Sequence, residues 1–138
     1  MAFRVEVSPR AFEDLDAIAD YIAKHGSFGR VQKWFNEMID AIASLKDTPR
    51  RCPVAVESEE LSREVRLLLH GKRSRMYKVY FAVRKEGQTS GTVQIFHVRH
   101  WAQRGLAADE LEQLMEEAGS EQPAASGKKQ NWAADERG

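Results

Sequence analysis

Cysteine, long hydrophobic runs and net charge are all scarce in this 138-residue chain, and each scarcity excludes a class of protein. The single cysteine, Cys52, rules out an internal disulfide and fits a reducing compartment, so we expect a cytoplasmic protein. No apolar run approaches the roughly 20 residues that cross a bilayer, and the N-terminus lacks a charged-then-apolar leader, so no membrane partner is expected. One cysteine among scattered histidines gives no zinc-binding spacing, and we expect neither a metal nor another cofactor.

The formal net charge of zero conceals a strong local asymmetry. Residues 61–105 hold ten Lys or Arg against two acids, whereas residues 1–60 hold eight against eleven and residues 106–138 hold three against eight. The middle segment therefore carries a net charge near +8, and its flanks carry about −3 and −5. Such a charge asymmetry indicates what kind of partner the chain binds, but it does not indicate the fold. We expect an anionic partner to meet the middle of the chain.

The first half of the chain reads as one strand followed by two helices. Apolar and charged residues alternate over residues 3–7, which predicts a half-buried strand. Ser8 then has the chemistry of a helix N-cap, and the helix that it starts is predicted to stop at Gly26. Apolar residues recur at helical spacing over residues 31–45, and Pro49 ends this second helix. Because the connection is short, the two helices are predicted to form an antiparallel hairpin.

Three further strands are expected over residues 65–69, 76–84 and 92–100. Glycine-containing turns join them, which implies antiparallel neighbours. In the second of these strands, one face is apolar and should lie beneath the helical hairpin: Tyr77, Val79, Phe81 and Val83. The opposite face is expected to carry Lys78 and Tyr80 and, depending on register, some of Arg66, Arg73, Arg75, Arg99 and the histidines.

The resulting prediction is an α+β fold of order β-α-α-β-β-β, with the antiparallel two-helix hairpin packed on a small, mainly antiparallel sheet. Residues 106–118 should add a short amphipathic helix that is acidic on its outer side. Residues 119–138 contain too little apolar surface to order themselves and are expected to be a disordered tail. Residues 1–105 would then form the functional domain.

This order of elements resembles the RelE/ParE superfamily of toxins from bacterial type II toxin–antitoxin systems. The motifs that carry the resemblance are A-F-x-D-L-x-x-I-x-x-Y-I at residues 11–22, Leu45 followed by Pro49, the pair Arg63 and Arg66, Y-K-V-Y-F-A-V at residues 77–83, and I-F-H-V-R-H at residues 95–100 leading to Arg104. The resemblance covers roughly residues 3–105. It implies a toxin that a cognate antitoxin neutralises with an acidic, extended C-terminal segment.

Two toxic activities occur in the superfamily. RelE-like members cut messenger RNA on the ribosome without a metal, which requires a base for the 2′-hydroxyl and cations around the phosphate. By resemblance, the candidate catalytic residues here are Lys78, His97, His100 and Arg104. The chain departs from that pattern at Arg99-His100-Trp101, and no tyrosine follows residue 101.

ParE-like members bind and poison DNA gyrase, and V-R-H followed by Arg104 looks more like this branch. We therefore favour a gyrase-inhibiting toxin, with the ribosome-dependent endoribonuclease as the alternative and a non-toxic nucleic-acid-binding module as a second one. Candidate contacts to the target or the antitoxin are Arg66, Arg73, Arg75, Lys78, Tyr80, Arg99, His100 and Arg104. The plainer interpretation is that one histidine is simply half-buried and that Arg99 or Arg104 forms a structural salt bridge.

Overall fold

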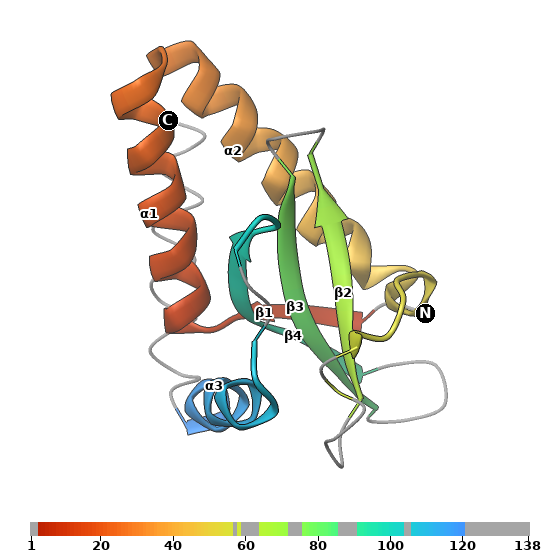
Figure 1. Cartoon of the computed structure of the whole chain (residues 1–138). Coiled ribbons are helices and arrows are strands. Elements are labelled where there is room, and N and C mark those ends of the chain that lie inside the picture. Colours follow the sequence, from red (N-terminus) through yellow and green to blue (C-terminus); the bar gives the residue numbers. More distant parts are fainter. Residues whose placement is uncertain are drawn as a thin grey trace.

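The computed structural model describes residues 3–56, 58, 64–71, 76–85, 91–103 and 106–120. Among these residues, no helix is long and apolar enough to cross a membrane. Along the chain the elements are β1 (Phe3–Val7), α1 (Pro9–His25), α2 (Phe28–Ala43), the short 3-10 helices η1 (Ser44–Lys46) and η2 (Pro49–Arg51), β2 (Val65–His70), β3 (Tyr77–Lys85), β4 (Gly91–His100) and α3 (Ala108–Ser120) (Figure 1).

The four strands form one sheet in the order β1-β4-β3-β2. The pairs β2–β3 and β3–β4 are antiparallel, whereas β1 lies parallel to β4, with Phe3 opposite Gly91 and Val7 opposite Ile95. The N-terminal strand thus joins the sheet beside the last strand of the chain. The predicted α+β fold, with its helical hairpin and mainly antiparallel sheet, is confirmed.

The helical hairpin begins at a buried cap. The Ser8 side chain accepts the Ala11 backbone N–H at 3.1 Å, and proline occupies the first helical turn, where its missing N–H costs nothing. At the other end of α1, Lys24 and His25 lie beside the last carbonyls. The second helix begins at Ser27, whose hydroxyl accepts the Arg30 N–H at 3.2 Å. The predicted start of the first helix at Ser8 is therefore confirmed.

The hairpin covers one face of the sheet (Figure 1). Its buried side chains pack with the strand residues that were predicted to face it, among them Tyr77, Val79 and Phe81. We call this the hairpin face. The helical contribution to this core is Ala11, Phe12, Leu15, Trp34, Met38 and Ile42.

The opposite face of the sheet is covered by α3, and we call it the α3 face. Tyr80 and Phe96 on this face are 0% and 1% exposed, and they pack with the apolar side of α3. That side consists of Leu111, Leu114, Met115 and Ala118, joined by Leu106. The amphipathic helix was predicted from its sequence. We did not predict that it would cover the face expected to carry the contact residues.

Candidate functional site

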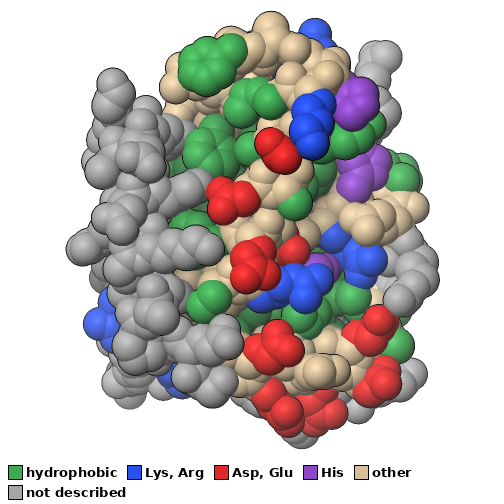
Figure 2. All heavy atoms as spheres, turned by 90° about the vertical axis from the view of Figure 1, so that its left-hand side faces the viewer, with side chains coloured by type: hydrophobic (Ala, Val, Ile, Leu, Met, Phe, Trp, Pro, Cys, Tyr) green, Lys and Arg blue, Asp and Glu red, His purple; other side chains and the backbone are tan. Residues whose placement is uncertain are grey.

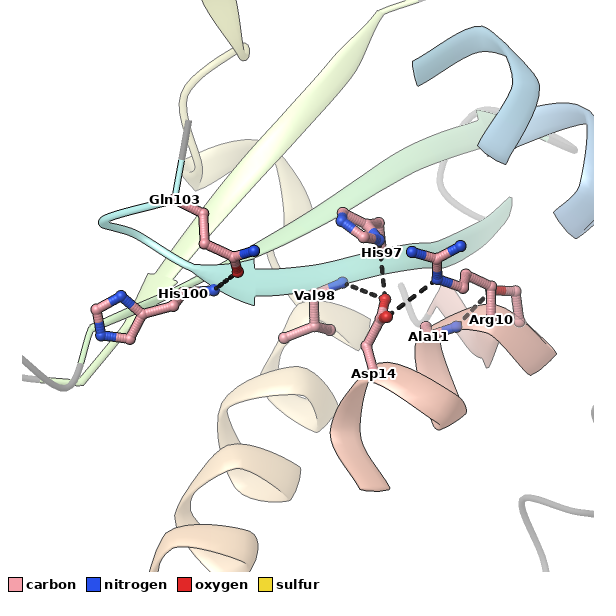
Figure 3. Close-up of polar contacts among 8 residues, drawn as sticks. Arg10, Ala11, Asp14, His97, Val98, His100 and Gln103 are labelled. Atoms are coloured by element: carbon pink, nitrogen blue, oxygen red, sulfur yellow. Dashed lines mark hydrogen bonds and ion pairs between the residues drawn. The ribbon is translucent and has the colours of Figure 1, made fainter. Parts of the chain in front are cut away.

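Asp14 on α1 is the centre of a polar network that fixes the helix to β4 (Figure 3). Its Oδ2 accepts the Val98 backbone N–H at 3.0 Å and lies 2.8 Å from Nδ1 of His97. Its Oδ1 accepts from Nε of Arg10 at 3.0 Å. The Asp14 and His97 side chains are only 13% and 6% exposed, so the carboxylate accepts from Val98 and Arg10 in a poorly hydrated place. Nδ1 of His97 lies beside it within ion-pair distance but makes no hydrogen bond among the described residues.

A β-bulge decides which way the histidines of β4 face. Tyr80 pairs with His97 and Phe81 pairs with Ile95, so Phe96 is the extra residue of β4. Since paired side chains lie on the same face, Phe96 and His97 both belong to the α3 face, whereas Val98 returns to the hairpin face. His100 pairs with Tyr77 and therefore lies on the hairpin face too.

Of the residues proposed for RNA cleavage, the three that the structure describes do not all lie on one face of the sheet. Lys78 pairs with Arg99 on the α3 face, and His97 on that face is 4% exposed and held against Asp14. His100 lies on the other side of the sheet, where its ring meets Tyr77 edge-on at a centroid distance of 5.2 Å. The fourth candidate, Arg104, lies outside the described residues.

Two of the candidate contact residues have structural surroundings that the sequence did not indicate. Tyr80 is fully buried beneath α3, so it can touch a partner only if α3 moves away. Arg66 pairs with Phe81 and so lies on the hairpin face rather than with Lys78. Its guanidinium donates to the Cys52 carbonyl at 2.5 Å and to Glu64 at 2.6 Å, which ties the connector to β2. The remaining candidates Arg73 and Arg75 lie outside the described residues.

A groove of about 820 Å³ lies between the helical hairpin and the end of β4 and borders two of the candidate residues. We call it the hairpin groove. Arg99, His100 and Gln103 form its strand side, and aromatic residues of α1, α2 and β3 contribute to its other walls. Its full lining is Asp14, Ala17, Ile18, Tyr21, Ile22, His25, Arg30, Trp34, Tyr77, Val98, Arg99, His100, Ala102 and Gln103. Figure 2 shows histidine and basic side chains beside hydrophobic ones on the face along which α1 lies.

A second, more polar hollow of about 340 Å³ lies between α1, β4 and α3. Arg10, His97 and Arg99 border it, together with Glu110 and Glu117 of α3. The Nε2 atom of His97 is buried here without a hydrogen-bond partner among the described residues. Acidic and basic side chains therefore border the same hollow.

Sequence reasoning missed His25, Arg30, Tyr21, Trp34 and Asp14 as members of a common site. His25 lies at the predicted stop of the first helix, next to Gly26, and Trp34 lies within the apolar pattern of residues 31–45 that predicts the second helix. No local pattern marks them, because α1, α2 and β4 meet here only in the folded chain. Within the described part of the chain, no three His, Cys, Asp or Glu residues are grouped so that they could hold a metal ion.

Comparison with known proteins identifies a family for the chain. No curated protein matches the chain. A family model described as "ParE toxin of type II toxin-antitoxin system, parDE" matches residues 5–105, which span β1 to the end of β4 and leave α3 outside the match. With most of its length matched, the chain belongs to the ParE toxin family of type II toxin–antitoxin systems.

Proposed function

We propose that this ParE-family chain arrests growth in the cytoplasm by binding DNA gyrase, and that a cognate antitoxin neutralises it. Gyrase inhibition needs a surface that binds, whereas RNA cleavage needs a base, an acid and cations at one phosphate. We favour gyrase binding over RNA cleavage because the described candidates for a nuclease site do not all lie on one face of the sheet. His97 and His100 lie on opposite faces of the sheet, and Lys78 shares a face with the buried His97.

The surface that we propose for the gyrase contact is the rim of the hairpin groove formed by the end of β4. Arg99 and His100 both line the groove, and Trp101 beside them is about half exposed. A cation, an imidazole and an exposed indole in sequence make a suitable anchor, because aromatic and Arg side chains dominate the energetics of protein interfaces. The strand beneath them is held by Asp14 and by Tyr77, so the anchor sits on a rigid element.

The antitoxin that we propose carries an acidic segment. The net charge near +8 over residues 61–105 favours an anionic partner, and charge complementarity would speed its encounter with the toxin. Part of this charge is already met within the chain, because α3 carries several acids and lies over the face that holds Lys78 and Arg99. We therefore expect the antitoxin to bind the hairpin side of the sheet rather than the side that α3 covers.

The test is induced expression of the full chain in a bacterial host, with growth, plasmid integrity and transcript integrity followed together. We compare the wild type with an Arg99→Ala/His100→Ala variant and with a matched Arg4→Ala/Lys33→Ala control, which removes two exposed cations elsewhere. Circular dichroism and thermal unfolding of the purified variants check that each is folded.

We expect wild type and control to stop growth, to accumulate cleaved plasmid and to leave messages intact, whereas the Arg99→Ala/His100→Ala variant grows. Coexpression of the cognate antitoxin should restore growth. Messages cut in a ribosome-dependent manner would replace the gyrase proposal by the endoribonuclease alternative. Normal growth of the wild type would leave a ParE fold without toxicity, as the nucleic-acid-binding alternative requires.

A further inference from the structure

We propose that Gln103 and the imidazole of His100 are positioning residues for Trp101, the exposed indole of the proposed gyrase contact. They hold Trp101 on a preformed turn that requires a neutral His100 ring, so that gyrase binding weakens as the pH falls. Because this role rests on the proposed gyrase contact, the turn and the contact are tested by separate measurements. The basis is the hydrogen bonding of residues 100–103, where the chain leaves β4.

Two hydrogen bonds between His100 and Gln103 close a turn directly after β4. The Gln103 backbone N–H donates to the His100 carbonyl oxygen at 3.0 Å, which is the bond between the first and fourth residues of a β-turn. In the opposite direction, the His100 N–H donates to Oε1 of Gln103 at 2.9 Å (Figure 3). Trp101 and Ala102 are therefore the two central residues, and the glutamine side chain fastens the turn to the end of the strand.

The two central residues are held as well. The Trp101 N–H donates to the Met76 carbonyl oxygen at 3.0 Å, which ties the turn to the chain just before β3. The Ala102 N–H donates to Nδ1 of His100 at 3.0 Å. All four backbone N–H groups of residues 100–103 thus have acceptors within the protein, although three of these residues are exposed. The turn is therefore ordered before any partner binds.

Such order increases the affinity of an interface anchor. Trp101 is 51% exposed, so its indole has surface left for a partner, and tryptophan is one of the side chains that most often dominate binding energy. Ordering a flexible loop during association costs free energy, and a preformed turn avoids that cost. Loss of the Gln103 acceptor therefore weakens binding even where Gln103 itself does not touch the partner.

The bond from Ala102 fixes the protonation state of His100 in the turn. A backbone N–H can only donate, so Nδ1 of His100 is unprotonated here. The ring is oriented by Tyr77, which is buried and meets it edge-on with centroids 5.2 Å apart. An imidazolium carries a proton on both nitrogens, so Nδ1 and the Ala102 N–H would be two donors facing each other. Since histidine changes charge between about pH 5 and 8, acidification through this range breaks the bond.

Other charged and titratable side chains border the groove beside His100. They are Asp14 and His25 from α1, Arg30 from α2, Tyr77 from β3 and Arg99 from β4. Only His25 among them shares the titration range of a histidine. Its Nδ1 lies 2.8 Å from the Tyr21 carbonyl oxygen, and an imidazolium nitrogen can still donate to a carbonyl. Protonation therefore breaks the printed bond of the His100 ring but leaves that of His25 intact.

The experiment measures the affinity of the purified full chain for intact gyrase near the two ends of the histidine range, at about pH 8 and about pH 5.5, at constant ionic strength. NMR relaxation without gyrase gives the order parameters of the Trp101 and Ala102 amides under the same conditions. The first measurement reports the contact, and the second reports the turn alone.

The variants separate a positioning role from a general loss of structure. Gln103→Ala removes the acceptor, Gln103→Glu restores one, and Gln32→Ala changes an exposed glutamine of α2 outside the groove. His100→Asn places an amide oxygen where Nδ1 stood, and an asparagine at this turn position accepts the N–H two residues on at any pH. His25→Asn is its control, and Trp101→Ala tests the anchor itself.

We expect the wild type to bind about three- to tenfold more weakly near pH 5.5 than near pH 8, which corresponds to the loss of about one hydrogen bond. His25→Asn should show the same loss, whereas His100→Asn should lose less than about twofold. Groups of gyrase that titrate are common to all variants and cancel in this comparison. The order parameter of Trp101 should fall on acidification in the wild type and stay constant in His100→Asn.

At about pH 8, Gln103→Ala should weaken binding by about three- to tenfold and lower the order parameter of Trp101. Gln103→Glu and Gln32→Ala should stay within about twofold of the wild type, and Trp101→Ala should lose about tenfold or more. Restoration by Gln103→Glu would show that the accepting oxygen is what matters.

An equal pH effect in the wild type and His100→Asn would overturn the proposal, and so would equal affinities of Gln103→Ala and Gln32→Ala. Either result leaves the gyrase contact itself in place. Wild-type affinity in Trp101→Ala would remove the anchor. Absence of gyrase binding by the wild type would refute the gyrase contact, and the order parameters would then still decide whether protonation of His100 opens the turn.

Discussion

Replacing Asp14 by alanine should destabilise the protein far more than its place on a charged helix suggests. The change leaves the buried Val98 N–H without its acceptor and takes the carboxylate away from His97. It also removes the partner of Arg10. A buried polar group without a partner costs about 1–3 kcal/mol, and a broken buried pair costs about 3–5 kcal/mol. Because Arg10 is half exposed and can turn to water, we expect a loss of about 2–4 kcal/mol in the free energy of unfolding.

Urea unfolding at neutral pH measures this loss, and Asp16→Ala is the matched control. Asp16 is exposed on the same helix, so its replacement changes helix propensity and dipole in the same way and should stay within about 0.5 kcal/mol of wild type. Asp14→Asn should be intermediate, since the amide oxygen can still accept from Val98 while the charge beside His97 is lost. If Asp14→Ala and Asp16→Ala unfold at the same urea concentration, the network contributes no stability and the reasoning fails.

Three further changes test other parts of the fold. Leu111→Ala, on the buried side of α3, should lower the free energy of unfolding by about 2–5 kcal/mol. The control Glu112→Ala changes an exposed residue of the same helix and should lower it by almost nothing. Equal values for the two variants would mean that α3 is not packed on the sheet. Ser8→Ala removes the buried cap of α1 and should cost about 1 kcal/mol in the same urea assay, and no measurable loss would refute its role. Burial raises the pKa of the Cys52 thiol above its ordinary value of 9.0, although Arg51 and Arg66 pull it down, so the unfolded chain loses this proton first. The stability that this neutral thiol contributes is therefore full below pH 9.0 and falls as the pH rises further, a decline that Cys52→Ala should reduce.

The elements of the fold were predictable because their signals are local. Alternation in residues 3–7, the cap at Ser8 and the helical spacing around Trp34 each depend on a few neighbouring side chains, and the structure confirms the strand and the helices that they imply. The face assignment of β3 was equally accessible, since period-2 alternation places Tyr77 and Val79 together.

The candidate site was less predictable because it depends on two non-local facts. The bulge at Phe96 adds a residue to β4, so strict alternation would have placed His97 with Ile95 on the hairpin face, which is wrong in the structure. The second fact is tertiary: His25 ends a helix and His100 ends a strand, and only the packing of α1 against β4 brings both to one groove. An amphipathic pattern likewise predicts α3 but not the face of the sheet that it covers.

The unequal lengths of β1 and β4 affect how copies of this chain behave when they are crowded. Backbone pairing with β1 reaches Ile95, which accepts the Ser8 N–H at 2.9 Å, and β4 then continues for several residues. On this continuation the Val98 N–H is taken by Asp14, and the His100 N–H is taken by Gln103 at 2.9 Å (Figure 3). An open strand edge is a template for association between chains, and side-chain oxygens that occupy its donors remove that template. The polar network around Asp14 therefore also protects this edge against aggregation.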